Sequence, residues 1–220
     1  MRRLHVTLKL ATSLDGRIAT SGGESRWITG PEARAEAHRL RAQCGAVMVG
    51  VGTARADDPE LTVRTDPPPR KQPLRIVLDS RFSLPLDRKL VRTARETPLL
   101  VIGAEGADAA QRLALEATGA ETAVVIESEA GVDLHAALSR LEERSLDRLL
   151  VEGGGKLAAG LIKAGLVDRF EWMRAPIVLG AEGVPAIGPL ALERLSEAPT
   201  FRRVALRELG PDLWESYERA

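Results

Sequence analysis

The feature of the sequence with the clearest chemistry is a run of glycines that follows an apolar segment. Residues 148–151 are expected to form a buried strand, and Glu152, Gly153, Gly154 and Gly155 lead from it into a helical pattern. Residues without side chains let an anion approach the backbone N–H groups at a helix N-terminus, where the helix dipole favours negative charge. We therefore interpret this segment as a phosphate-binding loop, with a tight turn that binds no ligand as the alternative.

The glycine run differs from the two most familiar nucleotide-binding motifs. A Walker A loop needs a wider glycine spacing and Ser or Thr after its lysine, but Leu157 follows Lys156. The G-x-G-x-x-G fingerprint is also absent from this loop. Residues 50–55 (GVGTAR) begin like that fingerprint, but Arg55 stands where its last glycine belongs, so this segment is a weak indication of a nucleotide site.

Charged groups gather just beyond the apolar run at residues 46–52. Asp57 and Asp58 come first, and Arg64 follows within the segment LTVR at 61–64. Open α/β sheets bind ligands beyond the carboxyl ends of their strands, which makes these groups candidates for a site. A solvated loop is the alternative.

Two arginines have the chemistry to hold a phosphate. Arg41 shares one stripe of a predicted helix with Arg34 and His38, and Arg64 lies in the charged segment described above. A guanidinium group can donate two parallel hydrogen bonds to phosphate, although such a stripe is usually solvated. The three histidines have no spacing typical of a metal site, so no metal is predicted.

Two further segments carry groups that could contact a ligand. Trp27 stands on a glycine-hinged loop before a predicted helix, where its ring either plugs the core or covers a ligand, and physical reasoning favours the core. Ser80 and Arg81 follow the predicted strand at 74–78, where a hydroxyl and a guanidinium could bind a ribose 2′-phosphate. A surface turn explains that pair equally well.

The elements that must position these groups alternate between strand and helix. Short apolar or alternating runs predict strands at residues 6–10, 46–52, 74–78, 98–102, 122–126 and 148–151. Helices are predicted at residues 108–118 and 134–143, and a capping box at Thr29 begins another that ends near Cys44. This alternation predicts an α/β fold with a mainly parallel sheet flanked by helices. Strand-like segments at 170–177 and 201–217 predict antiparallel strands at one edge, within a single domain over residues 1–220.

Composition narrows the class of protein. The chain has 220 residues, with 31 Lys and Arg against 31 Asp and Glu, so no overall basic field attracts nucleic acid. Cys44 is the only cysteine, which excludes an internal disulfide framework and fits a reducing compartment. No apolar run reaches the roughly 18 residues that a membrane helix needs, and the N-terminus lacks a signal-peptide pattern. A cytoplasmic protein with a small-molecule partner is expected.

Several segments together resemble the reductase half of the bacterial riboflavin-biosynthesis deaminase/reductase. They are LKLATSLDGR at residues 8–17, GESRWIT at 23–29, LRAQ at 40–43, ADDPELTVR at 56–64, RIVLDS at 75–80 and EGGGKLAAG at 152–160. The resemblance covers essentially the whole chain. Its specificity comes from finding these segments together in the right order, since any one of them alone would be weak. It implies a dihydrofolate-reductase-like fold and NADPH-dependent reduction of 5-amino-6-(5-phosphoribosylamino)uracil to the ribitylamino product.

The resemblance also implies roles for individual residues. By family pattern, the residues that contact NADPH would be Ala11, Trp27, Thr53, Asp57, Ser80, Gly154, Gly155, Lys156, Leu157, Ala158, Ala159 and Gly160, to which the strand-end position adds Arg81. Those that contact the substrate would be Ser25, Arg41, Leu61, Arg64 and Glu152, with both arginines and Ser25 around its phosphate. For the proton that accompanies hydride transfer we consider Lys9 the donor, with Asp57 in reserve.

Some expectations concern partners and alternatives. The zinc deaminase that precedes this domain in the bifunctional enzyme needs cysteines that are absent here, so a separate deaminase protein or a longer parent chain is expected. The family implies a homodimer. Alternative functions are reduction of 2,5-diamino-6-ribosylamino-pyrimidinone 5′-phosphate before deamination, NADPH binding without turnover, and dihydrofolate reduction, which the phosphate-suited arginines disfavour.

Overall fold

The computed structural model describes residues 3–129 and 131–220. The chain forms two compact units: one contains the residues up to Leu4 and His38–Leu150, and the other contains His5–Ala37 and Val151–Ala220. The boundaries fall within helix α1 (Pro31–Ala42) and strand β9 (Arg148–Val151). We describe each unit by itself, and a single domain over residues 1–220 stays a prediction.

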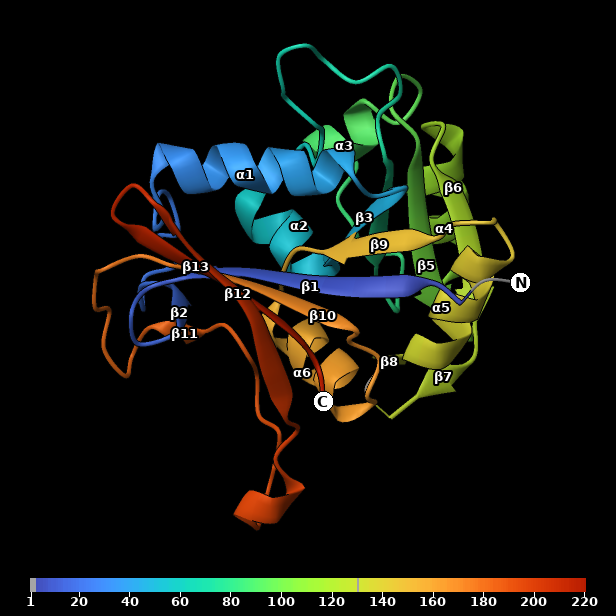
Figure 1. Cartoon of the computed structure of the whole chain (residues 1–220). Coiled ribbons are helices and arrows are strands. Elements are labelled where there is room, and N and C mark those ends of the chain that lie inside the picture. The colour runs from blue at the N-terminus through green and yellow to red at the C-terminus, as the bar shows by residue number, and fades with distance from the viewer. Residues whose placement is uncertain (1–2, 130) are drawn as a thin grey trace. The chain divides into compact units, whose positions relative to one another are not determined.

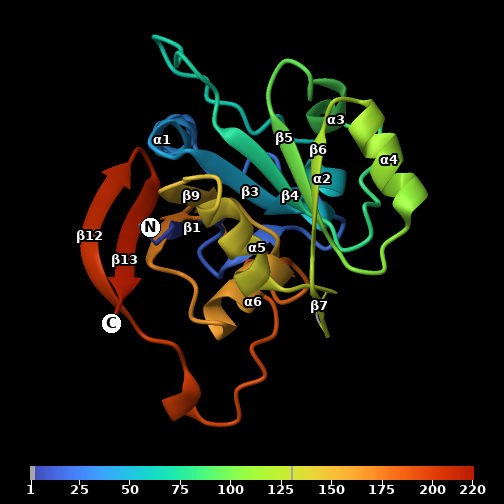
Figure 2. The same cartoon turned by 90° about the vertical axis from the view of Figure 1, so that its right-hand side faces the viewer.

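The first unit has a parallel sheet at its centre. Its strands are β3 (Ala46–Gly50), β4 (Leu74–Leu78), β5 (Leu99–Ala104) and β6 (Glu121–Val125), in the order β3-β4-β5-β6, and β9 lies next to β3. Its helices are α2 (Val51–Asp57), α3 (Lys89–Arg92), α4 (Ala109–Ala117) and α5 (Leu134–Glu142). A small hairpin of β7 (Glu127–Ser128) and β8 (Gly131–Val132) follows β6 (Figures 1 and 2).

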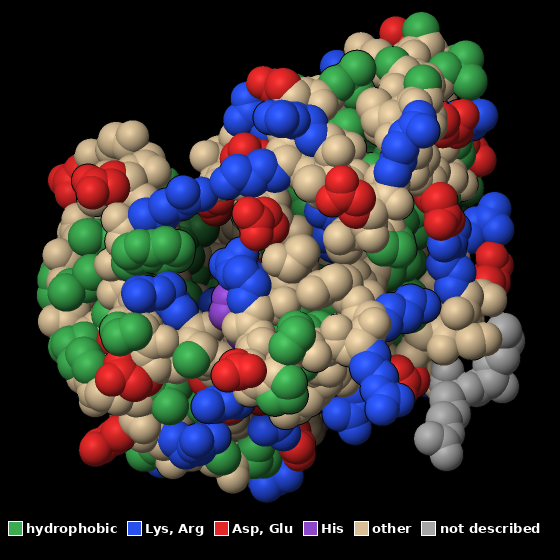
Figure 3. Space-filling model, turned by 90° about the horizontal axis from the view of Figure 1, so that it is seen from above, with side chains coloured by type: hydrophobic (Ala, Val, Ile, Leu, Met, Phe, Trp, Pro, Cys, Tyr) green, Lys and Arg blue, Asp and Glu red, His purple; other side chains and the backbone are tan. Residues whose placement is uncertain are grey.

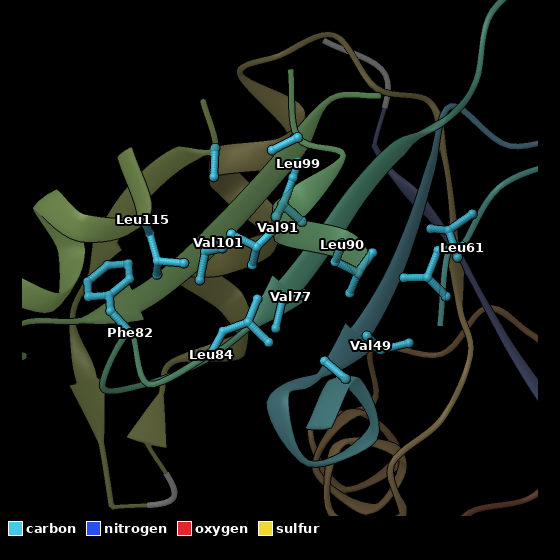
Figure 4. Packing of buried hydrophobic residues seen from close by; sticks show 14 of the residues in the cluster. Val49, Leu61, Val77, Phe82, Leu84, Leu90, Val91, Leu99, Val101 and Leu115 are labelled. Carbon is cyan, nitrogen blue, oxygen red and sulfur yellow. The ribbon is translucent and has the colours of Figure 1, made fainter. Parts of the chain in front are cut away.

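The core of this unit explains why its strands are apolar on both faces. Its buried cluster includes Val49, Val77, Val101 and Leu150 from the strands and Leu90, Val91 and Leu115 from the helices. In Figure 4, Phe82 and Leu115 lie towards one end of this cluster, and Val49 and Leu61 lie towards the other. A Cβ atom at Gly103 would come within 2.4 Å of the Phe82 ring, so the strand needs glycine there.

The second unit combines parallel and antiparallel pairing. Strand β1 (His5–Thr12) pairs in parallel with β10 (Arg169–Arg174), which pairs antiparallel with β13 (Asp212–Arg219), and β13 pairs antiparallel with β12 (Phe201–Leu209). A second small sheet joins β2 (Arg17–Ala19) to β11 (Val184–Pro185). Helix α6 (Gly155–Lys163) follows β9, and a short 3-10 turn spans Leu195–Glu197 (Figure 1).

Most predicted elements are confirmed. The fold is α/β, with a mainly parallel sheet, flanking helices and antiparallel strands from the C-terminal segment. One prediction is wrong at its end, because the strand predicted at residues 46–52 stops at Gly50 and residues 51–57 form α2. Gly50 provides an extended residue before that helix, and Ala54 is fully buried in the core beneath it.

The start of α1 also differs from the predicted capping box. The helix begins at Pro31, so Gly30 and not Thr29 is the capping residue. The Gly30 N–H donates to the Asp212 carboxylate at 2.6 Å, so this distant acid takes the place of the glutamate that accepts the N–H of the capping residue in a capping box.

The charged surface and the lengths of the helices were compared with what a membrane-spanning helix requires. Figure 3 shows Lys and Arg side chains interspersed with Asp and Glu over the visible face. Across residues 3–129 and 131–220, no helix combines the length and apolar character that crossing a membrane requires.

Candidate functional site

The predicted site residues divide between the two units. The first unit holds Arg41, Thr53, Asp57, Leu61, Arg64, Ser80 and Arg81. The second unit holds Lys9, Ala11, Ser25, Trp27, Glu152 and the segment from Gly154 to Gly160. We examine the local geometry of each group in turn.

The glycine loop has the backbone geometry that its composition predicts. Gly153 has φ +105° and Gly154 has φ +91°, a region that side-chain-bearing residues rarely adopt. A Cβ atom at Gly153 would find no described atom within 4 Å. The loop therefore has room beside Gly153 at a point where α6 presents its N-terminal N–H groups.

Gly155 serves a different purpose from Gly153. A Cβ atom at Gly155 would lie 2.7 Å from the Pro185 carbonyl oxygen, and the Gly188 N–H donates to the Gly155 carbonyl oxygen at 2.8 Å. Glycine is needed here because another backbone segment packs against the loop. The alternative of a tight packing turn thus applies to Gly155, while the room beside Gly153 suits a ligand.

Lys9 and Ala11 lie on one face of β1, opposite the buried side chains of Leu8 and Leu10. Both Lys9 and Ala11 are half-buried. Lys9 aligns with Glu171 on β10, so the two residues share a face of the sheet.

Glu171 is a buried charge that the sequence reasoning missed. Its carboxylate accepts hydrogen bonds from Arg169, Trp214 and Ser216. A charged residue within the apolar run FEWM at 170–173 was the available signal. Burial of a carboxylate requires such donors, which here come from strands β10 and β13.

Trp27 is exposed, so the interpretation that it plugs the core is wrong. Its relative exposure is 67%, and the Arg34 guanidinium carbon lies 4.6 Å from the centre of its ring. A cation above an aromatic face is attracted by the ring electrons. Ser25, two residues earlier, is half-buried.

The turn after β1 is organised by Asp15. Its carboxylate accepts the Ser13 hydroxyl at 2.6 Å, the Leu179 N–H at 3.1 Å and the Gly180 N–H at 2.8 Å. These donors, the Ser13 hydroxyl first among them, lower the pKa of Asp15 to about 2. Asp15 had no predicted role, although it lies in the segment LKLATSLDGR at residues 8–17.

We expect an NMR titration of the Asp15 carboxyl carbon to give a pKa of about 2, and Ser13→Ala to raise that pKa. Because the pKa is lowered in the folded state, the carboxylate contributes stability that is present above the ordinary value near 4. That contribution is lost as the pH falls towards about 2. An unchanged pKa in the Ser13 variant would contradict the assignment of the hydroxyl as the main cause.

In the first unit, α2 presents Thr53 and Asp57 four residues apart, on one face of the helix. Both side chains are half-buried. Asp58 follows with φ +42°, and its carboxylate accepts the Lys89 N–H at the start of α3 at 2.8 Å. Of the two predicted carboxylates, Asp58 therefore has a structural function.

The two arginines assigned to phosphate meet at residues 62–64, where Arg41 reaches from α1 and Arg64 belongs to the segment itself. The Arg41 guanidinium donates to the Thr62 carbonyl oxygen at 2.9 Å, and the Arg64 N–H donates to Nδ1 of His38 at 3.2 Å. The Arg64 side chain is exposed and pairs with Glu60 at 2.7 Å. The last turns of α1 thus fix the backbone that carries Arg64. The Glu60 carboxylate would compete with any bound anion for the Arg64 guanidinium.

Leu61 contributes to the core through its side chain. It is 3% exposed and belongs to the cluster in Figure 4, so a contact with substrate would have to come from its backbone. Its φ of +54° is unusual for leucine. Arg75 reaches this segment from β4, where its guanidinium donates to the Glu60 carbonyl oxygen at 3.4 Å.

Ser80 and Arg81 lie at the end of β4, as predicted. The Ser80 hydroxyl oxygen accepts the Val132 N–H at 3.0 Å, which leaves its proton available to donate. A Cβ atom at Gly131 would lie 2.2 Å from that oxygen, so the β7–β8 hairpin packs directly on Ser80. The preceding Asp79 is buried and organises the turn by accepting from Ser83 and the Leu84 N–H.

Comparison with known proteins gives consistent matches along the chain. A family model described as the RibD C-terminal domain matches residues 4–214. The riboflavin biosynthesis protein RibD of Aquifex aeolicus is 38% identical over 217 residues, which cover 99% of this chain and 58% of that protein. The 2,5-diamino-6-ribosylamino-4(3H)-pyrimidinone 5′-phosphate reductase of Methanothermobacter thermautotrophicus is 35% identical over 217 residues, 98% of both chains.

Solved structures agree. Form 1 of RibD from Acinetobacter baumannii has a TM-score of 0.84 and 29% identity, covering 99% of this chain and 58% of that one. Dihydrofolate reductase from Enterococcus faecalis has a TM-score of 0.56 at 13% identity over 98% of this chain, a likeness of fold alone. The chain thus spans 58% of the length of the RibD relatives named here.

Proposed function

Since the chain belongs to the RibD C-terminal domain family, we propose that it is an NADPH-dependent reductase of riboflavin biosynthesis that acts on a phosphoribosylated aminopyrimidine. The observation that carries the proposal is the family match over residues 4–214, which includes the glycine loop and both phosphate-suited arginines. A relative of equal length is named a reductase of such a pyrimidine phosphate.

The glycine loop fits a nicotinamide dinucleotide. The room beside Gly153 and the positive φ of Gly154 suit the approach of a pyrophosphate to the backbone N–H groups at the start of α6. In the first unit, the Ser80 hydroxyl proton and Arg81 suit the ribose 2′-phosphate that distinguishes NADPH from NADH. When bound, this cofactor supplies a hydride.

Residues that contact the substrate would assist hydride transfer to its acceptor carbon. The ribose anomeric carbon can accept a hydride only in its open-chain form, as an imine, and its nitrogen must then gain a proton. We assign that proton to Lys9, which is half-buried on β1, and keep Asp57 as the alternative donor. Glu152 at the end of β9 and Ser25 would bind the substrate.

We expect Arg41→Ala and Arg64→Ala each to weaken pyrimidine phosphate binding by about 2 kcal/mol while leaving NADPH affinity nearly unchanged. The reason is that a phosphate loses one charged donor in each variant. Isothermal titration with substrate and with NADPH separates the two effects. Glu60→Gln is the opposite test. It removes the carboxylate that competes for Arg64, so it should tighten substrate binding.

The deciding experiment mixes the purified protein with NADPH and each candidate pyrimidine phosphate and follows the loss of reduced-nicotinamide absorbance. Turnover of 5-amino-6-(5-phosphoribosylamino)uracil supports the main proposal, and preferred turnover of the diamino pyrimidinone phosphate supports the second candidate, which the Methanothermobacter relative favours. Binding of NADPH without turnover of either would identify a non-catalytic module. Parallel assays with NADH should show much weaker use of that cofactor.

We also propose that the protein acts in the cytoplasm as a homodimer, and that the deaminase belongs either to a separate protein or to a longer parent chain. The β12 edge, which exposes Leu206 at 51%, is the candidate contact. Light scattering of the purified chain checks the oligomeric state.

A further inference from the structure

The segment Ile177–Gly188, which we name the brace, connects the Asp15 turn with the glycine loop. All three elements belong to the second unit. At one end of the brace, Leu179 and Gly180 donate their N–H groups to the Asp15 carboxylate, and the Ile177 carbonyl oxygen accepts the Leu14 N–H at 2.7 Å. The turn after β1 thus holds the first part of the brace.

The other end of the brace touches the glycine loop directly. The Gly188 N–H donates to the Gly155 carbonyl oxygen in the glycine loop at 2.8 Å. Two residues earlier, the Ala186 N–H donates to the Gly16 carbonyl oxygen in the turn after β1 at 3.0 Å. Pro185 presents its carbonyl oxygen to the α carbon of Gly155 so closely that a Cβ atom there would lie at 2.7 Å. Two backbone contacts therefore fix the position of Gly155, the first residue of α6.

Apolar burial fixes only part of the brace. Ile177, Val178 and Val184 are 40%, 68% and 40% exposed, Leu179 and Ile187 are half-buried, and Ala186 is buried. Besides this burial and the two-residue pairing of β11 with β2, the hydrogen bonds described above hold the brace in place. Asp15 supplies the charged acceptor among them, and hydrogen bonds to a charged group are the stronger kind.

We infer that Asp15 is a positioning residue for the glycine loop: through the brace it sets where Gly155 and the N-terminus of α6 lie, and so how tightly the loop holds the cofactor pyrophosphate. This inference rests on the proposed function of that loop. In this inference Asp15 acts on the cofactor site through the brace and not by direct contact. Its effect should appear in cofactor affinity more than in substrate affinity.

The test compares Asp15→Asn and Gly188→Ala with Asp108→Asn. The first variant keeps the side-chain shape but replaces one acceptor oxygen with a donor group, and the second places a Cβ atom 3.0 Å from the Gly155 carbonyl oxygen at the other end of the brace. Asp108 is a matched control, because its carboxylate also accepts a backbone N–H, that of Ala110 at 2.8 Å, but at the start of α4 in the first unit.

Two quantities are measured: the Kd for NADPH, by fluorescence titration of the reduced nicotinamide, and amide hydrogen exchange without cofactor. We expect both brace variants to raise the Kd about tenfold and to speed exchange at Ala186 and Gly188, with little change in the KM for the pyrimidine. The control should match the wild type in both.

The outcomes separate the two proposals. If the wild type does not bind NADPH, the proposed function fails. If the wild type binds and both brace variants bind equally well, the inference about Asp15 is overturned while the function stands. If circular dichroism shows that Asp15→Asn is unfolded, Gly188→Ala decides the question alone. Equal losses of NADPH and pyrimidine affinity would also overturn the inference, because they indicate a general structural role.

Discussion

Replacing Arg75 with methionine should lower the free energy of unfolding by about 3–5 kcal/mol. The Arg75 side chain is 1% exposed, and its guanidinium donates to the Thr93 hydroxyl and to the carbonyl oxygens of Glu60, Leu90, Thr93, Thr97 and Pro98. Methionine fills a similar volume but leaves several of these buried acceptors without a donor. Chemical denaturation followed by circular dichroism measures the loss.

The donors of Arg75 matter more than its charge. Burial lowers the pKa of Arg75 to about 10, which means that folding disfavours the charged form. Arg75→Lys keeps the charge but offers fewer donors in a different geometry, so it should still lose a large part of the stability. Arg92→Met, at an exposed position of α3, is the control and should stay within about 0.5 kcal/mol of the wild type. Comparable stability of the Arg75 and Arg92 variants would refute the role of this hydrogen-bond hub.

Replacing Gly154 with valine should reduce NADPH affinity by about a hundredfold or more, enough to remove most of the thermal shift that the cofactor gives. A branched side chain at φ +91° forces the loop out of its conformation, and it also occupies space where we propose that the pyrophosphate approaches N–H groups. The backbone strain alone costs about 1–3 kcal/mol, so the melting temperature without cofactor should also fall.

Two neighbouring glycines separate packing from binding. Gly153→Ala adds a Cβ atom that meets no described atom within 4 Å, so the strain of its positive φ should be its only effect on stability. The same Cβ atom takes up room proposed for the cofactor, so the variant should bind NADPH more weakly. Gly155→Ala adds one 2.7 Å from the Pro185 carbonyl oxygen, so it should destabilise the protein even without cofactor. A Gly154 valine variant that keeps the full thermal shift would place the pyrophosphate elsewhere.

The strands were predictable because they are apolar runs bounded by turn residues. Residues 74–78 and 148–151 have the predicted bounds of β4 and β9, and the helix at 134–143 ends one residue earlier in α5. Helix α2 was missed because its sequence, VGTARAD, has four polar or flexible residues against three apolar ones, and the burial of Ala54 that stabilises it is a tertiary effect.

The partners of the site residues could not be read from the sequence. Asp15 accepts N–H groups 164 and 165 residues away, and Gly30 is capped from 182 residues away. Trp27 was assigned to the core on its size, which does not reveal that Arg34 covers its ring. The family pattern gave residue roles without these contacts, and those roles stay predictions.

The parallel pairing of β1 with β10 has a consequence for the order of events during synthesis. Thr7 of β1 aligns with Arg169 of β10, so most of the chain must be synthesised before this pair of strands can form. The strands of the first unit, β3 to β6, pair with successive neighbours and can associate as they emerge from the ribosome. Until β10 is made, His5–Thr12 lacks this parallel partner, so the side chains of Val6, Leu8 and Leu10 lack part of the packing that buries them in the folded protein, which makes the nascent chain more prone to aggregation.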